Sequence, residues 1–398
     1  MTDMSIPQGW YMVPIGDCII ERRKSQINVE DATGYGNYPF FTSGEAVLLH
    51  DKKQVEGENI YIADGGTANV IYFDGDAAYS NHTYVVGSKD GYSTKFLFYA
   101  LKYLEDYINT NYFQGTGLKN LQKKDFKHHE LIIPSSLEEQ ERIAKALTQI
   151  DDAIDSSSRL IAKYELVKKG LMHDLLTYGI DKDGNIRSEL THQFKDSPIG
   201  RIPVEWEVVE LETIANEIQD CPHSTPEYLD AGILVARTTC IKNGRYLVEG
   251  SSYVTMQEYE KRISRMQPRH NDIIFTREAP VGEAFVIPSG MTICLGQRVM
   301  CIRCNNAMNP HFLILNIYAD YMAEQYRSVI GGTTVSHLNV AEVKRIKLIK
   351  PSINEQNKIV EKMDEMEKIL RSLELKKINL ENQRSGLLSD LMTGKVRI

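Results

Sequence analysis

Two stretches of the chain decide its fold: residues 136–177, SLEEQERIAKALTQIDDAIDSSSRLIAKYELVKKGLMHDLLT, and residues 352–393, SINEQNKIVEKMDEMEKILRSLELKKINLENQRSGLLSDLMT. They align without a gap at a constant offset of 216 residues. Identical pairs include Glu139/Glu355, Gln140/Gln356, Ile143/Ile359, Leu171/Leu387 and Asp174/Asp390. A repeat of this length predicts one structural element that occurs twice in the chain.

Both stretches are predicted to be long helices. Each opens on the S-x-x-E pattern of a capping box, at Ser136 and Ser352, and then places apolar side chains at alternating steps of four and three residues. The predicted seam consists of Ile143, Leu147, Ile150, Ile154, Ile161, Leu171 and Leu175 in the first copy, and of Ile359, Met363, Met366, Leu370, Leu373, Leu380, Leu387 and Leu391 in the second. A period of 3.5 residues indicates a coiled coil.

An apolar stripe needs a partner in water, so we expect the two helices to pair with each other. About 38 residues at a rise of ~1.5 Å give a rod of roughly 57 Å. Lys168 and Arg384 interrupt the seam at the same place in each copy, and either set the register or face a partner. The alternative is two unrelated amphipathic helices, each packed on its own core.

Matches outside the helices extend the repeat. Trp10 corresponds to Trp206, and Gly115–Leu118 corresponds to Gly332–Val335. Short strand-like runs broken by Gly, Asp and Pro predict mixed α/β globular parts. The expected organisation is a globular part at 1–134, a helix at 135–178, a polar linker at 179–203 that lets the second part reposition, a longer globular part at 204–350, and a helix at 351–398.

Composition narrows the class of protein. The chain has 398 residues and a net charge of −8, with 42% hydrophobic and 25% charged residues, which is ordinary globular usage. The sequence contains no run of 18 apolar residues that could span a membrane, and its first residues lack the pattern of a secretion signal. Six cysteines are too few for a disulfide scaffold. We therefore expect a cytoplasmic protein without a membrane partner.

The sequence contains no convincing catalytic site. The phosphate loop G-x-x-x-x-G-K-[ST] and the dinucleotide pattern G-x-G-x-x-G are both missing. Asn309–Phe312 is the nearest approach to an amino-methyltransferase segment and lacks its second proline. Cys301 and Cys304 have metal-ligand spacing, but no second pair of ligands accompanies them. We expect no catalytic residue, no metal site and no cofactor in this chain.

Polar loops between the short strands are the candidate functional surface. Their Arg, Asn, Gln, Ser and Thr side chains suit the reading of base edges, and Gly-Thr loops offer backbone N–H groups to phosphates. The candidates in the first globular part are Ser43, Gly66, Thr67, Asn69, Asn81, His82, Thr116, Lys119 and Asn120. Those in the second are His223, Ser224, Thr225, Arg237, Thr238, Thr239, Arg277, Gln297, Arg298, Thr333, Thr334 and His337. The alternative is that these are ordinary turns, where the same residue types dominate.

The layout as a whole resembles the specificity subunit of type I restriction–modification systems. The resemblance rests on two dissimilar globular parts, each followed by a Pro…Glu-Gln…Ile helix that ends in Leu171–Thr177 or Leu387–Thr393. The approach to the second globular part, Ser197–Glu207, is similar to that of the family, and Gln8–Trp10 is a shorter form of it. The resemblance covers the whole chain.

The resemblance implies an α+β protein with two globular α/β target-recognition domains separated by a long antiparallel two-helix coiled coil. It implies a non-catalytic subunit for phage defence that reads a bipartite, asymmetric site on double-stranded DNA. Two modification subunits would dock on the helices and methylate adenine with S-adenosylmethionine. Restriction subunits would use ATP and Mg²⁺ to translocate and cut DNA. The recognised bases cannot be read from the sequence.

Two other functions stay open at this point. A coiled-coil adaptor whose globular parts bind proteins would share the helices and have no specificity for DNA. A methyltransferase fused to a helical bundle is a third hypothesis, and it would require S-adenosylmethionine to bind this chain alone.

Overall fold

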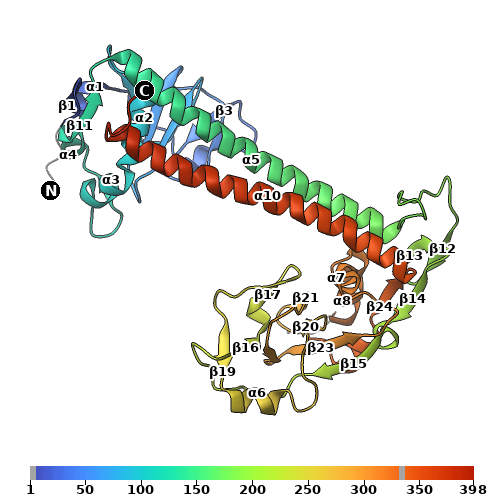
Figure 1. Ribbon diagram of the computed structural model, residues 1–398. Coiled ribbons are helices and arrows are strands. Elements are labelled where there is room, and N and C mark those ends of the chain that lie inside the picture. The colour runs from blue at the N-terminus through green and yellow to red at the C-terminus, as the bar shows by residue number, and fades with distance from the viewer. Residues whose placement is uncertain (1–5, 331–336) are drawn as a thin grey trace. The chain divides into compact units, whose positions relative to one another are not determined.

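The computed structural model describes residues 6–330 and 337–398. The chain divides into two compact units: unit 1 combines Met1–Leu160 with Leu373–Ile398, and unit 2 comprises Ile161–Ser372. Two long helices, α5 (Leu137–Thr177) and α10 (Ile353–Met392), each contribute one part to unit 1 and the other part to unit 2 (Figure 1). Within the described ranges, none of the helices has the length and apolar character that crossing a membrane requires.

The globular part of unit 1, residues 6–134, is called head 1. Its central sheet has four antiparallel strands in the order β2-β8-β5-β6: Ile19–Glu21, Thr83–Ser88, Glu58–Ala63 and Val70–Asp74. A second sheet has the order β4-β3-β7, with β3 antiparallel to β4 and parallel to β7: Leu48–His50, Tyr38–Phe41 and Ala78–Tyr79. Two further ladders pair β1 with β11 and β9 with β10: Trp10–Pro14, Glu130–Pro134, Phe113–Gln114 and Asn120–Leu121. The helices of head 1 are α1 (Ile15–Cys18), α2 (Thr94–Tyr103), α3 (Glu105–Tyr112) and α4 (Lys123–His128).

The globular part of unit 2, residues 204–330 and 337–350, is called head 2. Its central sheet has the order β15-β23-β20-β21: Ala215–Asp220, Val299–Cys304, Ile273–Arg277 and Val281–Val286. Its second sheet has the order β19-β16-β22: Ser252–Val254, Ile233–Ala236 and Ile293–Leu295. The two-stranded ladders are β14 with β24 and β17 with β18: Glu207–Glu210, Lys347–Lys350, Ile241–Lys242 and Arg245–Tyr246. Its helices are α6 (Met256–Arg262), α7 (Pro310–Ile317), α8 (Asp320–Ile330) and α9 (Val340–Lys344).

The two heads have the same strand order and the same strand directions. In the central sheets, the pair Ile62↔Tyr84 of β5 and β8 corresponds to the pair Phe275↔Met300 of β20 and β23. In the second sheets, β16 is antiparallel to β19 and parallel to β22, as β3 is to β4 and β7. The sequence suggested dissimilar globular parts, and this description holds for their side chains but not for their fold.

The central strand of each head is buried on both faces, which explains its continuous apolar sequence. In β5, Ile60 and Ile62 belong to the apolar core that includes Phe96 of α2, whereas Tyr61 packs with Phe41 on the other face. In β20, Ile273 and Phe275 share a core with Phe312 of α7, and Ile274 belongs to a separate core. Each central sheet therefore lies between a helix and the second sheet.

The segment 179–203 is a packed part of unit 2. It forms an antiparallel hairpin of β12 (Phe194–Ser197) and β13 (Gly200–Pro203). Ile180 and Ile202 are buried in the core of head 2, and Arg187 is buried in an ion pair with Glu355. The expectation of a free linker that lets the second part reposition is therefore not met, because these residues anchor the segment to α10.

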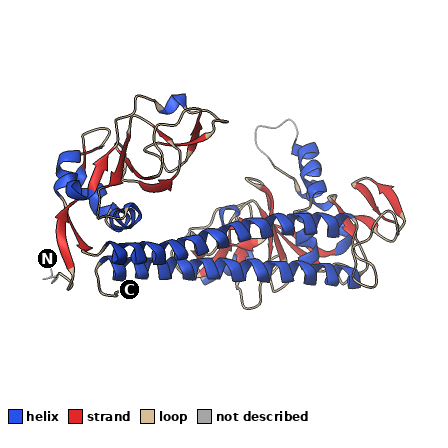
Figure 2. Cartoon of the chain, turned by 90° about the horizontal axis from the view of Figure 1, so that it is seen from above, coloured by secondary structure: helices blue, strands red, loops and turns tan. Residues whose placement is uncertain are grey.

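The two long helices pair antiparallel within each unit. In unit 1, Leu391 of α10 shares an apolar core with Ile143 of α5, and in unit 2 Ile359 of α10 shares a core with Leu175 of α5. Both views show α5 and α10 side by side (Figures 1 and 2). None of the predicted seam residues is exposed, whereas Leu166 and Leu375, which lie off the seam, are. The expected coiled coil is confirmed.

The start of each long helix is bonded to its own head. Ser136 Oγ accepts a hydrogen bond from the backbone N–H of Glu139 at 3.4 Å, and Ser352 Oγ accepts one from Glu355 at 3.3 Å, which is the serine half of each predicted capping box. Gln140 Oε1 accepts a hydrogen bond from the backbone N–H of Ser93, the N-cap of α2, at 3.0 Å. The equivalent Gln356 accepts one from the N-cap of α7, Asn309, at 2.8 Å. The repeated glutamine thus fixes a helix of each head onto a long helix.

Candidate nucleic-acid interface

The polar loops predicted in head 1 lie together at one end of β5. The backbone N–H of Asp64, the residue after β5, donates to the carbonyl of His82 at 2.9 Å. The carbonyl of Asp64 accepts from Leu121 at 3.1 Å, and the N–H of Gly66 donates to the carbonyl of Lys119 at 2.8 Å. These bonds join the loops 64–69, 80–82 and 115–120, which are far apart in the sequence.

A fourth loop, residues 42–44, joins the same cluster. Ser43 Oγ donates to the carbonyl of His82, and Asn69 Nδ2 donates to the carbonyl of Gly44 at 3.0 Å. None of the nine predicted contact residues of head 1 is buried, and Thr67, His82, Thr116, Lys119 and Asn120 are exposed. The cluster is an accessible, hydrogen-bonded surface built from four loops.

One ion pair of this cluster was not predicted from the sequence. Lys123 Nζ lies 2.7 Å from Asp64 Oδ2 and 5.0 Å from the ring centroid of Tyr84. The side chains of Lys123 and Asp64 are 34% and 16% exposed. The sequence shows Lys123 only as a charged residue at the start of α4, because its partner Asp64 is 59 residues away.

The loops predicted in head 2 meet at the equivalent end of β20. The N–H of Arg277 donates to the carbonyl of Arg298 at 3.0 Å, and the carbonyl of Arg277 accepts from Leu338 at 2.8 Å. The N–H of Gly296 donates to the carbonyl of Ala236, at the end of β16, at 2.9 Å. These bonds join the predicted loops around 237–239, 277, 297–298 and 337, and the loop 223–225 is linked to them through Asp220, which lies 3.0 Å from Arg277 and 3.4 Å from His223. Thr333 and Thr334 lie outside the described residues.

The same backbone hydrogen bonds occur in both heads, so their loops can be matched residue by residue. The Asp64–His82 bond corresponds to the Arg277–Arg298 bond, and the bond from Leu121 to Asp64 corresponds to the bond from Leu338 to Arg277. The bond from Ser80 to Phe41, at 2.9 Å, corresponds to the bond from Gly296 to Ala236. His82 and Arg298 thus occupy one position of a common frame, and the acidic Asp64 of head 1 is replaced by the basic Arg277 in head 2.

Two carboxylates lie beside Arg277. Its guanidinium Nε lies 3.0 Å from Asp220 Oδ1, and its Nη2 lies 3.9 Å from Glu278. His223 lies 3.4 Å from the same Asp220. Arg277 was predicted to contact bases, but it is only 7% exposed and its charge is compensated within the head. Its position favours holding the loops over contacting DNA.

Two other arginines lie in or beside these loops, and only one of them, Arg237, was predicted from the sequence. Arg262 is 5% exposed and donates to the carbonyls of Leu295 at 2.9 Å and Ser224 at 2.6 Å, which ties two of the predicted loops to α6. Only its (i, i+4) spacing from Glu258 could be read from the sequence. The predicted Arg237 donates to Ser252 Oγ at 2.8 Å and lies over the ring of Tyr228.

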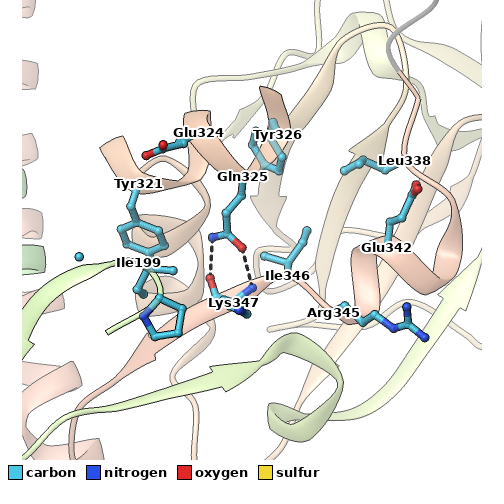
Figure 3. Close-up of a pocket in the computed structure, with 12 residues that line it drawn as sticks. Ile199, Tyr321, Glu324, Gln325, Tyr326, Leu338, Glu342, Arg345, Ile346 and Lys347 are labelled. Carbon is cyan, nitrogen blue, oxygen red and sulfur yellow. Dashed lines mark hydrogen bonds between the residues drawn. The ribbon is translucent and has the colours of Figure 1, made fainter. Parts of the chain in front are cut away.

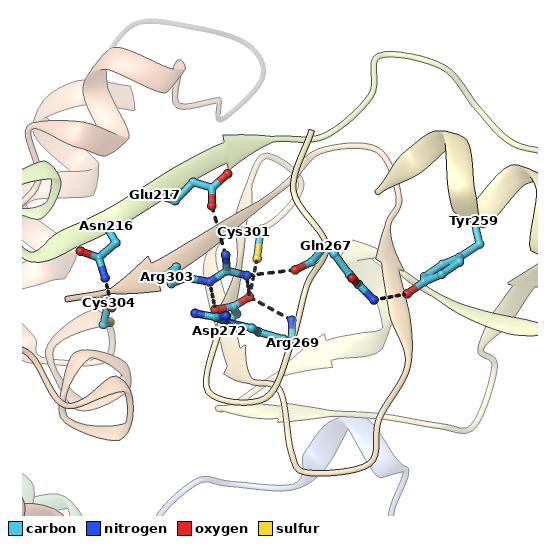
Figure 4. Close-up of polar contacts among 9 residues, drawn as sticks. All are labelled: Asn216, Glu217, Tyr259, Gln267, Arg269, Asp272, Cys301, Arg303 and Cys304. Carbon is cyan, nitrogen blue, oxygen red and sulfur yellow. Dashed lines mark hydrogen bonds and ion pairs between the residues drawn. The ribbon is translucent and has the colours of Figure 1, made fainter. Parts of the chain in front are cut away.

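A second polar network lies in the central sheet of head 2, away from these loops (Figure 4). Arg303 binds Asp272 through two hydrogen bonds of 2.9 and 2.7 Å, and it also donates to Glu217 at 3.1 Å and to the carbonyl of Gln267 at 2.9 Å. Asp272 is 1% exposed, so the bidentate pair is a structural anchor for the segment between α6 and β20.

The cysteines of β23 show no metal-binding arrangement. Cys301 lies in one apolar core of head 2 while Cys304 packs against another, and both are free thiols. Burial raises the pKa of the Cys304 thiol to about 12. Among the described residues, no cluster of three or more His, Cys, Asp or Glu side chains could hold a metal ion.

A pocket lies where the β12–β13 hairpin meets α8 (Figure 3). Ile199 of the hairpin faces Tyr321, and Gln325 exchanges hydrogen bonds of 2.9 Å with both the N–H and the carbonyl of Lys347. Gly282 leaves no room for a Cβ beside the ring of Tyr326, another lining residue. None of the residues predicted to contact DNA lines this pocket, although Leu338, which donates its N–H to the carbonyl of Arg277, does.

Comparisons with known proteins match the chain along its whole length. The family model described as the type I restriction modification DNA specificity domain matches residues 7–166 and 203–382. The chain is 25% identical to the type I restriction enzyme MjaVIII specificity subunit of Methanocaldococcus jannaschii, over 100% of this chain and 95% of that protein. It is 19% identical to the EcoDI specificity subunit of Escherichia coli, over 92% and 83% of the two chains. Its fold is similar to the crystal structure of the type I restriction–modification S subunit of M. genitalium, with a TM-score of 0.62, 17% identity and coverage of 98% and 97%.

Proposed function

The chain belongs to the family of type I restriction–modification specificity subunits, and we propose that its two heads each read one half of a bipartite, asymmetric site on double-stranded DNA. It serves as the recognition subunit of the complex and not as an enzyme. In this proposal the chain works in the cytoplasm, and the methylation and cleavage of DNA belong to its partner subunits.

One observation carries the proposal: the two heads present different side chains on one common loop frame. The frame is defined by matching backbone hydrogen bonds, such as Asp64 to His82 and Arg277 to Arg298. A rigid backbone with variable exposed side chains is what base-edge reading requires, since specificity depends on donors and acceptors held at fixed places. Because the exposed residues differ between the heads, the two half-sites are expected to differ.

The long helices support the proposed docking of two modification subunits. The helix pair repeats itself at an offset of 216 residues, so it offers two similar surfaces to two copies of one partner. In this proposal the lengths of α5 and α10 set the spacer between the half-sites. The modification subunits use S-adenosylmethionine, and the restriction subunits use ATP and Mg²⁺.

The experiment that tests this function is a selection from duplex DNA of randomised sequence. The full chain, together with its modification subunits, is incubated with the pool, and bound duplexes are sequenced. The expected result is a two-part motif with an unread spacer. Enrichment of no motif would contradict the proposal, and a set of protein partners that survives nuclease treatment would then favour a protein adaptor.

A second arm tests the role of the helices. One heptad is inserted into both α5 and α10, at positions opposite each other, so that the seam keeps its period. The spacer between the half-sites is expected to change while both half-sites stay the same. An unchanged spacer would refute the role of the helices as a ruler.

A further inference from the structure

The residue that precedes β8 in head 1 and β23 in head 2 combines a fixed backbone with an exposed side chain. The carbonyl of His82 accepts hydrogen bonds from the N–H of Asp64, at 2.9 Å, and from Ser43 Oγ. The carbonyl of Arg298 accepts one from the N–H of Arg277, at 3.0 Å. Both residues are therefore held at the end of the central strand of their head.

Their side chains are free to meet a ligand. His82 and Arg298 are exposed, while the residues before them, Asn81 and Gln297, are half-buried. Among the described residues, the imidazole of His82 has no hydrogen-bond partner. The side chain of Arg298 is 55% exposed, and among the described residues its one ion-pair partner is Glu278, at 3.7 Å.

The other arginines in the head 2 loop cluster are already engaged. Arg277 is buried against Asp220, and Arg237 is bonded to Ser252 and stacked on Tyr228. Arg262 is buried and occupied by two backbone carbonyls. Within the described part of this cluster, Arg298 is thus the arginine whose guanidinium can leave its long ion pair with Glu278 and bind a ligand instead.

Arg298 also has a backbone that an arginine rarely adopts. Its φ is +67°, in the left-handed region that favours glycine. The strained residue is held by the bond from Arg277 and by the strand that follows it. Such conformations persist where the surrounding structure determines them, and they are concentrated at functional sites.

We propose that His82 and Arg298 are one base-reading position repeated in the two heads, and that Arg298 selects guanine in the half-site read by head 2. The proposal rests on the proposed function. A guanidinium forms two hydrogen bonds with the O6 and N7 acceptors of guanine in the major groove, and no other base presents this pair. The histidine at the equivalent place predicts a different preference in the half-site of head 1.

The test uses the full chain with its modification subunits and a pool of randomised duplexes. Arg298→Ala is expected to lower the preference for guanine at one position of one half-site by about 5- to 150-fold, the discrimination of a bidentate pair, and to leave every other position unchanged. His82→Arg is expected to create a guanine preference at the corresponding position of the other half-site. Arg265→Ala is the matched control, because it removes an equal charge from an exposed residue of head 2 outside the loop cluster.

The outcomes separate this inference from the proposed function. A uniform loss of affinity for all sequences in Arg298→Ala, with no change in the motif, would mean that the side chain binds phosphate and would overturn the inference. An unchanged motif in both variants would overturn it as well. In either case the wild-type bipartite motif would still support the proposed function, whereas a wild-type chain that selects no motif would refute that function itself. Matching thermal unfolding curves of variant and wild type establish that each variant is folded.

Discussion

Nε of Arg384 on α10 lies 3.0 Å from Oδ1 of Asp151 on α5, and this ion pair joins the two helices within unit 1. The equivalent residues, 216 positions away in the sequence, are Glu367 for Asp151 and Lys168 for Arg384. They form a second ion pair, which joins the same helices within unit 2. Each acid also meets a group of its own head: Tyr99 donates to Asp151 at 2.8 Å, and Arg245 lies 2.6 Å from Glu367. The two charged interruptions of the seam thus bind across the helix pair and fix its register.

Reversing one charge of this pair is expected to destabilise unit 1. Arg384→Asp places two carboxylates together on half-buried side chains, and we expect a loss of about 1 kcal/mol in the free energy of unfolding, measured in urea. The double variant Asp151→Arg/Arg384→Asp is expected to recover most of it. Asp152→Arg, on the exposed neighbour, is the control and should have little effect. If the losses in the free energy of unfolding of the two single variants simply add in the double variant, the ion pair does not join the two helices.

The buried pair Arg187–Glu355 is expected to matter more than its exposed counterpart, Arg397–Glu139. The side chains of Arg187 and Glu355 are 9% and 10% exposed, so Glu355→Ala leaves a buried charge without compensation, at a cost of about 3–5 kcal/mol. Arg397 is 47% exposed and can turn to water, so Glu139→Ala should cost about 1 kcal/mol. Urea unfolding compares the two. Equal losses would show that burial does not decide the effect.

The stability of unit 1 is expected to fall in acid through Glu139. The hydrogen bonds from Arg397 hold the pKa of this carboxyl below its ordinary value of 4.5, so the folded state binds its proton less tightly than the unfolded state does. The stabilisation is therefore present above pH 4.5 and is lost as the pH falls through the lower, folded pKa. Glu139→Gln should be less stable than wild type at neutral pH, and the difference should shrink in acid. A difference independent of pH would contradict this assignment.

The thiols are expected to react slowly in the folded protein. All six cysteines are free and five of them are buried. Burial raises the pKa of Cys18 and of Cys294 to about 11, so little of the reactive thiolate forms at mildly alkaline pH. Ellman's reagent should modify the native chain slowly and all six thiols once urea unfolds it. Rapid native labelling of several thiols would show that these cores open readily.

Removing Arg277 is expected to weaken DNA binding without changing its specificity. Arg277→Ala leaves the carboxylate of Asp220, which is 14% exposed, without its closest cation, so the loops of head 2 should loosen. We expect a lower temperature of unfolding and lower affinity for all sequences in fluorescence polarisation. A selective loss at one base position would instead restore the direct contact suggested by the sequence.

The two long helices and their pairing could be predicted from the sequence, because their signal is both periodic and repeated. The seam at Ile143 and Ile359 depends on spacing alone, and spacing is visible without coordinates. The shared frame of the heads could not be predicted, since it depends on backbone hydrogen bonds such as Arg277 to Arg298, which leave no trace in side-chain identity. The loops stay a prediction as a DNA-contacting surface, and the burial of Arg277 and the bonds of Arg262 could not be predicted because they depend on partners distant in sequence.

The antiparallel helix pair also dictates the order in which the protein can be completed. Ile143 and Leu391 belong to one apolar core, yet more than half the chain separates them. At a synthesis rate of about 5–20 residues per second, the first helix leaves the ribosome on the order of 10–50 s before its mate. The head encoded first is therefore the last to be finished. A truncation that removes Leu373–Ile398 takes away part of unit 1, and thus damages head 1 although head 2 lies nearer in sequence to the lost residues.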